Sequence, residues 1–155
     1  MTNEILLRDV VEDDLPVFYE HQIDADAVEM AAHLPRDYEA FQLHWTDLLA
    51  KNAVVKKTIL VDQRVTGYVI SFVYFGVREV GFWIGKEYWG QGIATRALSK
   101  FLEQVPLRPL RASAAKHNRG SLRVLEKCGF RIVGEDKAFS NMGGRVVEGI
   151  VLNLE

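Results

Sequence analysis

The sequence predicts an α/β domain of the α+β type, built on a mixed sheet. Strand-like apolar runs alternate with amphipathic helical segments, and three of these runs follow one another with no helix between them. The chain has 155 residues, of which 48% are hydrophobic and 26% are charged. These values are ordinary for a globular protein, so we expect one domain over residues 1–155.

The helices follow from apolar spacing and from the residues at their ends. The clearest one follows a glycine-rich turn, carries two adjacent i, i+4 apolar rows and is ended by Pro106. Another begins at Asn118, a plausible N-cap, and stops at Gly129. In chain order the expected segments are 13–22, 24–35 (irregular or weakly helical), 36–51, 93–105 and 118–128.

The strands follow from short runs rich in apolar and β-branched residues. A tight connection at 62–64 joins two of them, and a loop at 141–144 closes a C-terminal hairpin. The expected strands are 5–10, 58–62, 65–74, 79–84, 109–115, 130–133 and 146–154. The element order is therefore β-α-α-β-β-β-α-β-α-β-β.

Charge and cysteine content narrow the class of protein. The formal net charge of −2 argues against a general nucleic-acid-binding surface. No apolar run reaches membrane-spanning length, and residues 1–5 show no leader-like pattern, so we expect a cytoplasmic protein. The lone Cys128 excludes an internal disulfide, and the histidines show no metal-ligand spacing, so no metal site is expected.

The turn Trp89-Gly90-Gln91-Gly92-Ile93-Ala94-Thr95 is the most informative segment. It joins a strand to a helix start, where free backbone N–H groups and the helix dipole favour a phosphate or pyrophosphate. We therefore expect a cofactor with a diphosphate, although an ordinary loop can also carry two glycines. A dinucleotide-binding fingerprint would stand in the first βα unit, and no Walker A lysine follows the turn.

A second motif lies about 25 residues downstream, at Asn118-Arg119-Gly120-Ser121 and Glu126-Lys127-Cys128-Gly129-Phe130. With the glycine turn, it resembles the GNAT N-acetyltransferases, in particular their RimJ/RimL-like branch. The resemblance covers roughly residues 60–154. It implies the GNAT fold: a mixed, mostly antiparallel central sheet with a splayed parallel strand pair and helices on both faces.

The resemblance also implies acetyl-CoA as cosubstrate and an amine as acceptor. The amides of residues 90–95 would hold the pyrophosphate, and the pantetheine would run beside the backbone of Trp83 and Ile84. Asn118 and Ser121 would face the pantetheine arm and the sulfur. The implied cofactor-binding residues are Trp83, Ile84, Trp89, Gly90, Gln91, Gly92, Ile93, Ala94, Thr95, Asn118 and Ser121.

The implied chemistry is direct attack of an amine on a thioester, which requires a base for the ammonium proton. Glu79 is the candidate base, with Glu135 and Glu148 as rivals and a solvated strand-end glutamate as the alternative. Family members often carry a tyrosine acid where this chain has Leu125, so Ser121 is the candidate donor to the leaving sulfur. A non-catalytic acyl-CoA-binding sensor is the alternative function.

The acceptor stays open among a protein N-terminus, an amino acid, a polyamine and an antibiotic amine. An acidic stretch would favour a cationic acceptor or form a solvated face; its members are Asp24, Asp26, Glu29, Asp37 and Glu39. A homodimer is possible, and no nucleic-acid or membrane partner is expected.

Other candidates have simpler structural interpretations. Cys128 with His117 would suggest a covalent acyl-enzyme, but a small buried hydrophobe is the more common role of such a cysteine. Arg123 and Lys127 fit either a nucleotide phosphate or a solvated helix face. An aromatic set fits either an acceptor wall or a helix–sheet core; its members are Phe18, Tyr19, Tyr38, Phe41 and Trp45.

Overall fold

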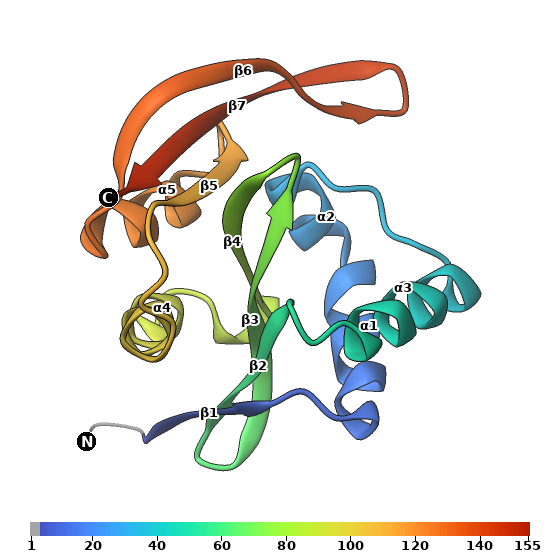
Figure 1. Cartoon of the computed structure of the whole chain (residues 1–155). Coiled ribbons are helices and arrows are strands. Elements are labelled where there is room, and N and C mark those ends of the chain that lie inside the picture. The colour runs from blue at the N-terminus through green and yellow to red at the C-terminus, as the bar shows by residue number, and fades with distance from the viewer. Residues whose placement is uncertain (1–3) are drawn as a thin grey trace.

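Seven strands form one mixed sheet in the order β1-β2-β3-β4-β5-β7-β6 (Figure 1). The computed structural model describes residues 4–155, so residues 1–3 of the stretch searched for a leader lie outside the described residues. The strands are β1 (Ile5–Asp9), β2 (Val55–Val61), β3 (Arg64–Tyr74), β4 (Val77–Ile84), β5 (Leu110–Ala115), β6 (Arg131–Met142) and β7 (Arg145–Leu154). All neighbours are antiparallel except β4 and β5, which are parallel.

Helices cover both faces of the sheet (Figure 1). They are α1 (Leu15–Ile23), α2 (Ala25–Ala31), α3 (Tyr38–Ala50), α4 (Ile93–Gln104) and α5 (Arg119–Lys127). The first three lie on one side of the sheet and the last two on the other. The expected mixed, mostly antiparallel sheet with helices on both faces is confirmed. None of the helices within residues 4–155 is long and apolar enough to cross a membrane.

Two apolar clusters hold these layers together. The larger one lies between the sheet and the helices α4 and α5, around the fully buried Phe101 and Leu98. The second lies between the sheet and the helices α1 and α3, around Phe18, Phe41 and Trp45. The aromatic residues of α1 and α3 are therefore helix–sheet core, since burying them removes large apolar surfaces from water.

The structure sharpens one expectation about local structure and corrects another. Residues 25–31 form a regular helix, α2, whose N-cap Asp24 accepts a hydrogen bond from the Ala27 amide at 2.9 Å. The strand expected at 130–133 runs on to Met142 as β6. Most of β6 is exposed, so it has no apolar alternation, and its pairing with β7 rather than its sequence pattern makes it a strand.

The parallel strands β4 and β5 separate soon after they meet. Within residues 4–155, the single registered pair between them is Glu79 with Arg111. Beyond it β4 remains bonded to β3 as far as Ile84, and β5 remains bonded to β7 as far as Ala115. The expected splayed pair is therefore present, and its open end faces the start of α4 and α5.

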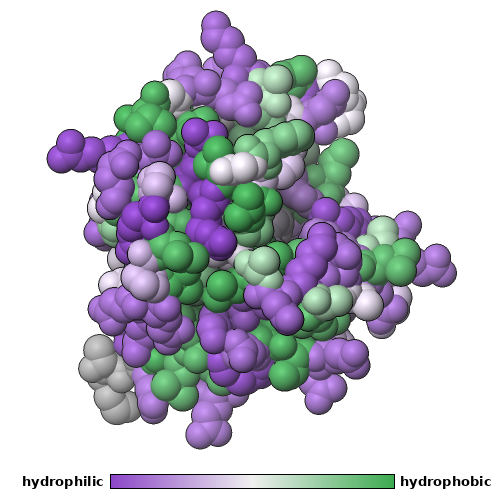
Figure 2. Space-filling view, in the orientation of Figure 1, coloured by the Kyte–Doolittle hydropathy of each residue, from purple (hydrophilic) through white to green (hydrophobic). Residues whose placement is uncertain are grey.

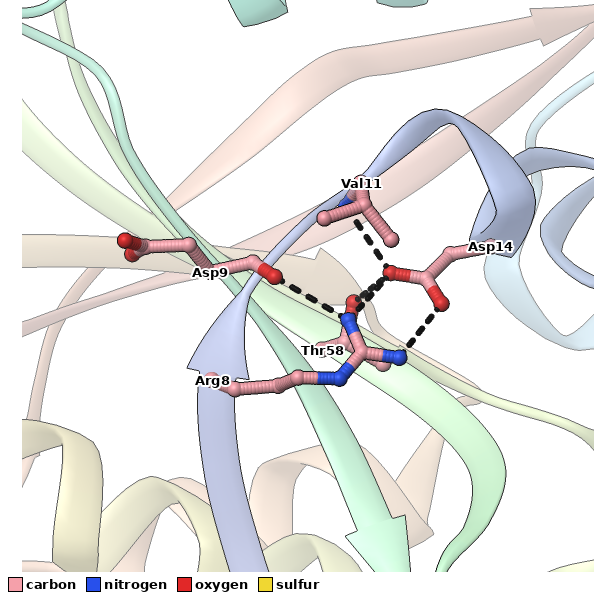
Figure 3. A network of polar contacts seen from close by, with 5 residues as sticks. All are labelled: Arg8, Asp9, Val11, Asp14 and Thr58. Atoms are coloured by element: carbon pink, nitrogen blue, oxygen red, sulfur yellow. Dashed lines mark hydrogen bonds and ion pairs between the residues drawn. The ribbon is translucent and has the colours of Figure 1, made fainter.

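A half-buried ion pair fixes the turn after β1 to the sheet (Figure 3). Arg8 donates from both Nη atoms to the two carboxylate oxygens of Asp14, each at 2.7 Å. The same carboxylate accepts from the Thr58 hydroxyl at 2.6 Å and from the Val11 amide at 3.0 Å. Burial raises the pKa of Asp14, but the hydrogen bonds from Arg8, Thr58 and Val11 outweigh this and lower it overall.

We predict that Asp14→Ala lowers the free energy of unfolding by about 3 kcal/mol, at the low end for a broken buried pair because Arg8 is partly solvated. Thr58→Val, which removes one hydrogen bond, should cost about 1 kcal/mol. Urea unfolding measures both. Since the folded pKa of Asp14 is depressed, its contribution is present above the ordinary aspartate pKa and disappears as the pH falls through the folded value. An Asp14→Ala deficit that persists unchanged at low pH would contradict this assignment.

Candidate active site

A cavity of about 440 Å³ opens where β4 and β5 separate. The end of β4, the loop after it and the first turns of α4 and α5 form its walls, and α2 covers it from the side. Figure 2 shows hydrophobic and hydrophilic residues interspersed over the face in view. Ten of the eleven residues expected to bind a cofactor line this cavity: Trp83, Ile84, Trp89, Gly90, Gly92, Ile93, Ala94, Thr95, Asn118 and Ser121.

The glycine turn presents backbone donors to the cavity. Gly90 and Gly92 both have φ of +75°, a conformation that other residues rarely adopt, and a Cβ built on either would meet no protein atom within 4 Å. Gly92 is the N-cap of α4 and supplies no side-chain cap. The amides of the first helical turn therefore have no intrahelical acceptor, and they face open space that suits an anion.

Two neighbouring side chains of the turn have different roles. The Trp89 indole N–H donates to the Ile84 carbonyl at 2.9 Å, which ties the turn to the end of β4. Gln91 is exposed, lies outside the cavity lining, and directs its amide toward the Glu87 carbonyl at 3.5 Å. The sequence motif places Gln91 beside the glycines, but the turn directs its side chain elsewhere.

The start of α5 forms the opposite wall. The Asn118 side chain caps this helix by accepting from the Ser121 amide at 3.2 Å, as its sequence position predicts. Arg123, Val124 and Lys127 also line the cavity, so both basic side chains lie on its wall. Arg123 and Lys127 line the same cavity as the α4 amides that have no intrahelical acceptor. Together these positive groups make this end of the cavity attractive to phosphate groups.

Glu79 lies on the sheet face that α1 and α3 cover. In β4 its side chain shares this face with Trp83, because side chains alternate along a strand and Trp83 pairs with Tyr68 of that core. Glu79 does not line the cavity; it stands where β4 and β5 close, beside Arg111. Burial raises the pKa of Glu79, and the charge of Arg111 opposes that rise only in part.

The rival carboxylates are engaged elsewhere. Glu135 and Glu148 both pair with Lys116, at 3.4 and 3.6 Å, on the C-terminal hairpin. Neither lines the cavity between β4 and β5. Leu125, at the position where a tyrosine acid was considered, is 2% exposed and belongs to the large apolar core.

Cys128 and His117 do not form a catalytic pair. The Cys128 thiol lies 3.6 Å from the Thr95 carbonyl, whereas the His117 ring contacts the Glu29 carbonyl at 2.8 Å. Burial raises the pKa of the Cys128 thiol, which keeps it protonated. The interpretation of Cys128 as a small, half-buried hydrophobe therefore fits its surroundings.

The contribution of α2 was not visible in the sequence. Ala27, Met30 and Ala31 line the cavity, and the sequence predicted only an irregular or weakly helical segment here. The β6–β7 hairpin holds it in place: Arg145 pairs with Glu29 at 2.6 Å, and Ser140 donates to the Ala32 carbonyl. These contacts join segments more than 100 residues apart, so no local pattern predicts them.

Comparisons with known proteins agree with this geometry. The family model described as "Acetyltransferase (GNAT) domain" matches residues 4–131. No curated protein matches closely enough to count as a relative. Among solved structures, an acetyltransferase of the GNAT family from Bacillus anthracis is 20% identical, with a TM-score of 0.79 over 99% of this chain and 96% of that one.

Two further structures share the fold at low identity. Spermidine N-acetyltransferase from Vibrio cholerae, in complex with CoA and spermine, is 17% identical, with a TM-score of 0.84 over 97% of this chain and 94% of that one. Mycobacterium smegmatis RimJ, in complex with CoA-disulfide, is 20% identical, with a TM-score of 0.79 over 97% and 81%. Since the family model covers most of the sequence, this chain belongs to the GNAT family of acetyltransferases and is an acyltransferase.

Proposed function

We propose that this protein is an acetyl-CoA-dependent N-acetyltransferase that moves an acetyl group to a primary amine by direct attack in a ternary complex. One observation carries the proposal: the cavity between the splayed strands ends on the uncapped N-terminus of α4, at two glycines with positive φ. The motif from Trp89 to Thr95 and the fold shared with M. smegmatis RimJ support placing it in the RimJ/RimL-like branch.

The residues of the cavity fit a CoA thioester. The free amides after Gly90 and Gly92 suit the pyrophosphate, and Arg123 and Lys127 add positive charge nearby. The walls toward β4 are apolar, as a pantetheine arm requires. Along Trp83 and Ile84 the edge of β4 has no strand partner on the β5 side, so its backbone groups can pair with the amides of that arm.

The proposed reaction forms a C–N bond and breaks a C–S bond. The acceptor ammonium first gives a proton to the Glu79 carboxylate, directly or through water, and the neutral amine attacks the thioester carbon. A backbone N–H of β4 stabilises the carbonyl oxygen as charge develops on it. The CoA thiolate then leaves and takes up the second proton that the attacking nitrogen releases as the amide forms. The Ser121 hydroxyl, on the cavity wall, is the proposed hydrogen-bond donor to its sulfur.

Isothermal titration with acetyl-CoA, CoA and NAD tests the proposal first. We expect micromolar binding of both CoA forms and none of NAD. A free-thiol assay with a panel of amines then measures turnover. Binding without turnover on any amine is what a non-catalytic sensor would give, and absence of CoA binding would overturn the proposal.

We predict that Gly92→Ala weakens CoA binding about tenfold or more, because a methyl group there holds a phosphate away from the α4 amides. The positive φ should also cost about 1 kcal/mol of unfolding free energy. Gly143→Ala is the matched control, since Gly143 has φ of +67° in the β6–β7 turn and does not line the cavity. Urea unfolding should show the same loss of unfolding free energy in both variants, whereas titration should show a loss of CoA affinity only in Gly92→Ala.

We predict that Glu79→Gln lowers kcat at neutral pH by about 10²- to 10⁴-fold while CoA affinity is unchanged. In the unmodified enzyme kcat/KM should fall as the pH drops through the pKa of Glu79, which burial places above that of an ordinary glutamate. The fall of kcat/KM on the acid side of the pH profile should therefore occur at higher pH than an exposed carboxylate would give. Glu135→Gln and Glu148→Gln serve as controls, and a comparable loss in either would assign the base to the hairpin instead.

A further inference from the structure

The acidic stretch of residues 24–39 has structural roles that leave little charge for an acceptor. Asp24 and Asp37 cap α2 and α3 by accepting from backbone amides at 2.9 and 2.8 Å. Asp26 pairs with Lys86, and Glu29 pairs with Arg145. Four of the five carboxylates that hinted at a cationic acceptor are thus already paired or capping.

On the sheet face beside Glu79, by contrast, polar groups lack partners. Arg111 shares this face, because its neighbours Leu110 and Ala112 point into the core under α4 and α5. The Arg111 Nε and the Trp83 indole Nε1 are buried and have no hydrogen-bond partner. Buried donors without an acceptor are rare and costly, and two on one face point to a ligand that supplies acceptor oxygens.

A second guanidinium comes from the connection between α2 and α3. The side-chain amide of the buried Gln22 bonds both the carbonyl and the amide of Arg36, at 3.0 and 3.1 Å, and so fixes its backbone. In the same connection His33 contacts the Trp83 ring, with centroids 6.3 Å apart. Within residues 4–155 the half-buried Arg36 side chain makes no hydrogen bond or ion pair.

The charge of Arg36 reaches the same face. Burial lowers the pKa of His33 and of His44, and Arg36 lowers both further, so neutral imidazoles rather than more cations surround it. Burial raises the pKa of Tyr68 to about 12, a rise that Arg36 opposes, so the phenol stays neutral as well. Within residues 4–155, the charged groups around Trp83 that form no ion pair are therefore the guanidiniums of Arg111 and Arg36 and the carboxylate of Glu79.

We infer that the acceptor is a small zwitterionic amine, one that carries an anionic oxygen-acid group such as the carboxylate of an amino acid. The inference rests on the proposed function and names its substrate class. The acceptor ammonium faces Glu79. Its carboxylate accepts hydrogen bonds from Arg111 and Trp83 and is attracted by the charge of Arg36. A polycationic amine would instead place positive charge against both guanidiniums.

Matched acceptors test the inference directly. The free-thiol assay compares a panel of amino acids with their carboxamides, with spermidine and with a short peptide bearing a free N-terminus. We expect kcat/KM for the best amino acid to exceed that of its amide by about tenfold or more, since charge-assisted bonds to arginine are lost in the amide. Thermal shift in the presence of CoA measures binding of the same compounds independently of turnover.

Variants separate a binding role from a structural one. Arg111→Gln and, independently, Arg36→Gln should raise KM for the amino acid about tenfold and leave KM for its amide unchanged. Arg78→Gln is the control, because Arg78 precedes Glu79 in β4 but lies on the opposite face of the sheet, where it donates to Ser71 at 3.2 Å. CoA affinity should stay normal in all three, since none of these residues lines the cavity.

The outcomes distinguish the two proposals. Equal kcat/KM for acid and amide, preference for spermidine or the peptide, or no binding of any amino acid beside CoA would overturn the inference while the acetyltransferase proposal stands. Failure to bind acetyl-CoA at all would overturn both. An acid–amide difference that survives in Arg111→Gln and in Arg36→Gln would also contradict the assignment.

Discussion

The separation of β4 from β5 is the constraint on which the site depends. Each strand is bonded along its length to another partner, β4 to β3 and β5 to β7, so each can leave the other without losing its place in the sheet. Gly67 allows the close packing that holds the end of β4, since a Cβ there would lie 2.0 Å from the Trp83 carbonyl. The result is a gap in which β4 and β5 are no longer paired with each other, wide enough for the cavity that opens there.

The helices around this gap both support the fold and form the walls of the cavity. Apolar faces of α4 and α5 pack on the core, while their N-terminal turns look into the cavity. The wall formed by α2 is held differently, through Asp24 at its N-cap and through Glu29 and Ala32 to the hairpin. Exposed ion pairs contribute little stability, so the apolar cluster of Ala32, Ala115 and Val147 adds a contact that joins the end of α2 to the sheet.

The role of a charged side chain in this molecule can be assigned only when its partners are known. Asp14 is buried and stabilises the fold because Arg8, Thr58 and Val11 satisfy it. Asp26 and Glu29 look like features of a substrate surface in the sequence but are neutralised by Lys86 and Arg145. No motif singles out Arg111, which lies beside Glu79, or Arg36, whose charge acts on Tyr68 and His33. Neither guanidinium forms an ion pair within residues 4–155.

The sequence by itself determined what local chemistry controls: the amphipathic α4 and α5, the cap at Asn118 and the glycine turn. The family resemblance supplied the set of expected cofactor residues, ten of which line one cavity. Only the tertiary structure decided which distant segments complete it. Helix α2 is too short to show an apolar face, β6 is exposed and depends on β7, and Gln91 turns away from its own motif. Periodicity reports which face of an element is buried, whereas the partners of a polar side chain depend on contacts between segments far apart in the chain.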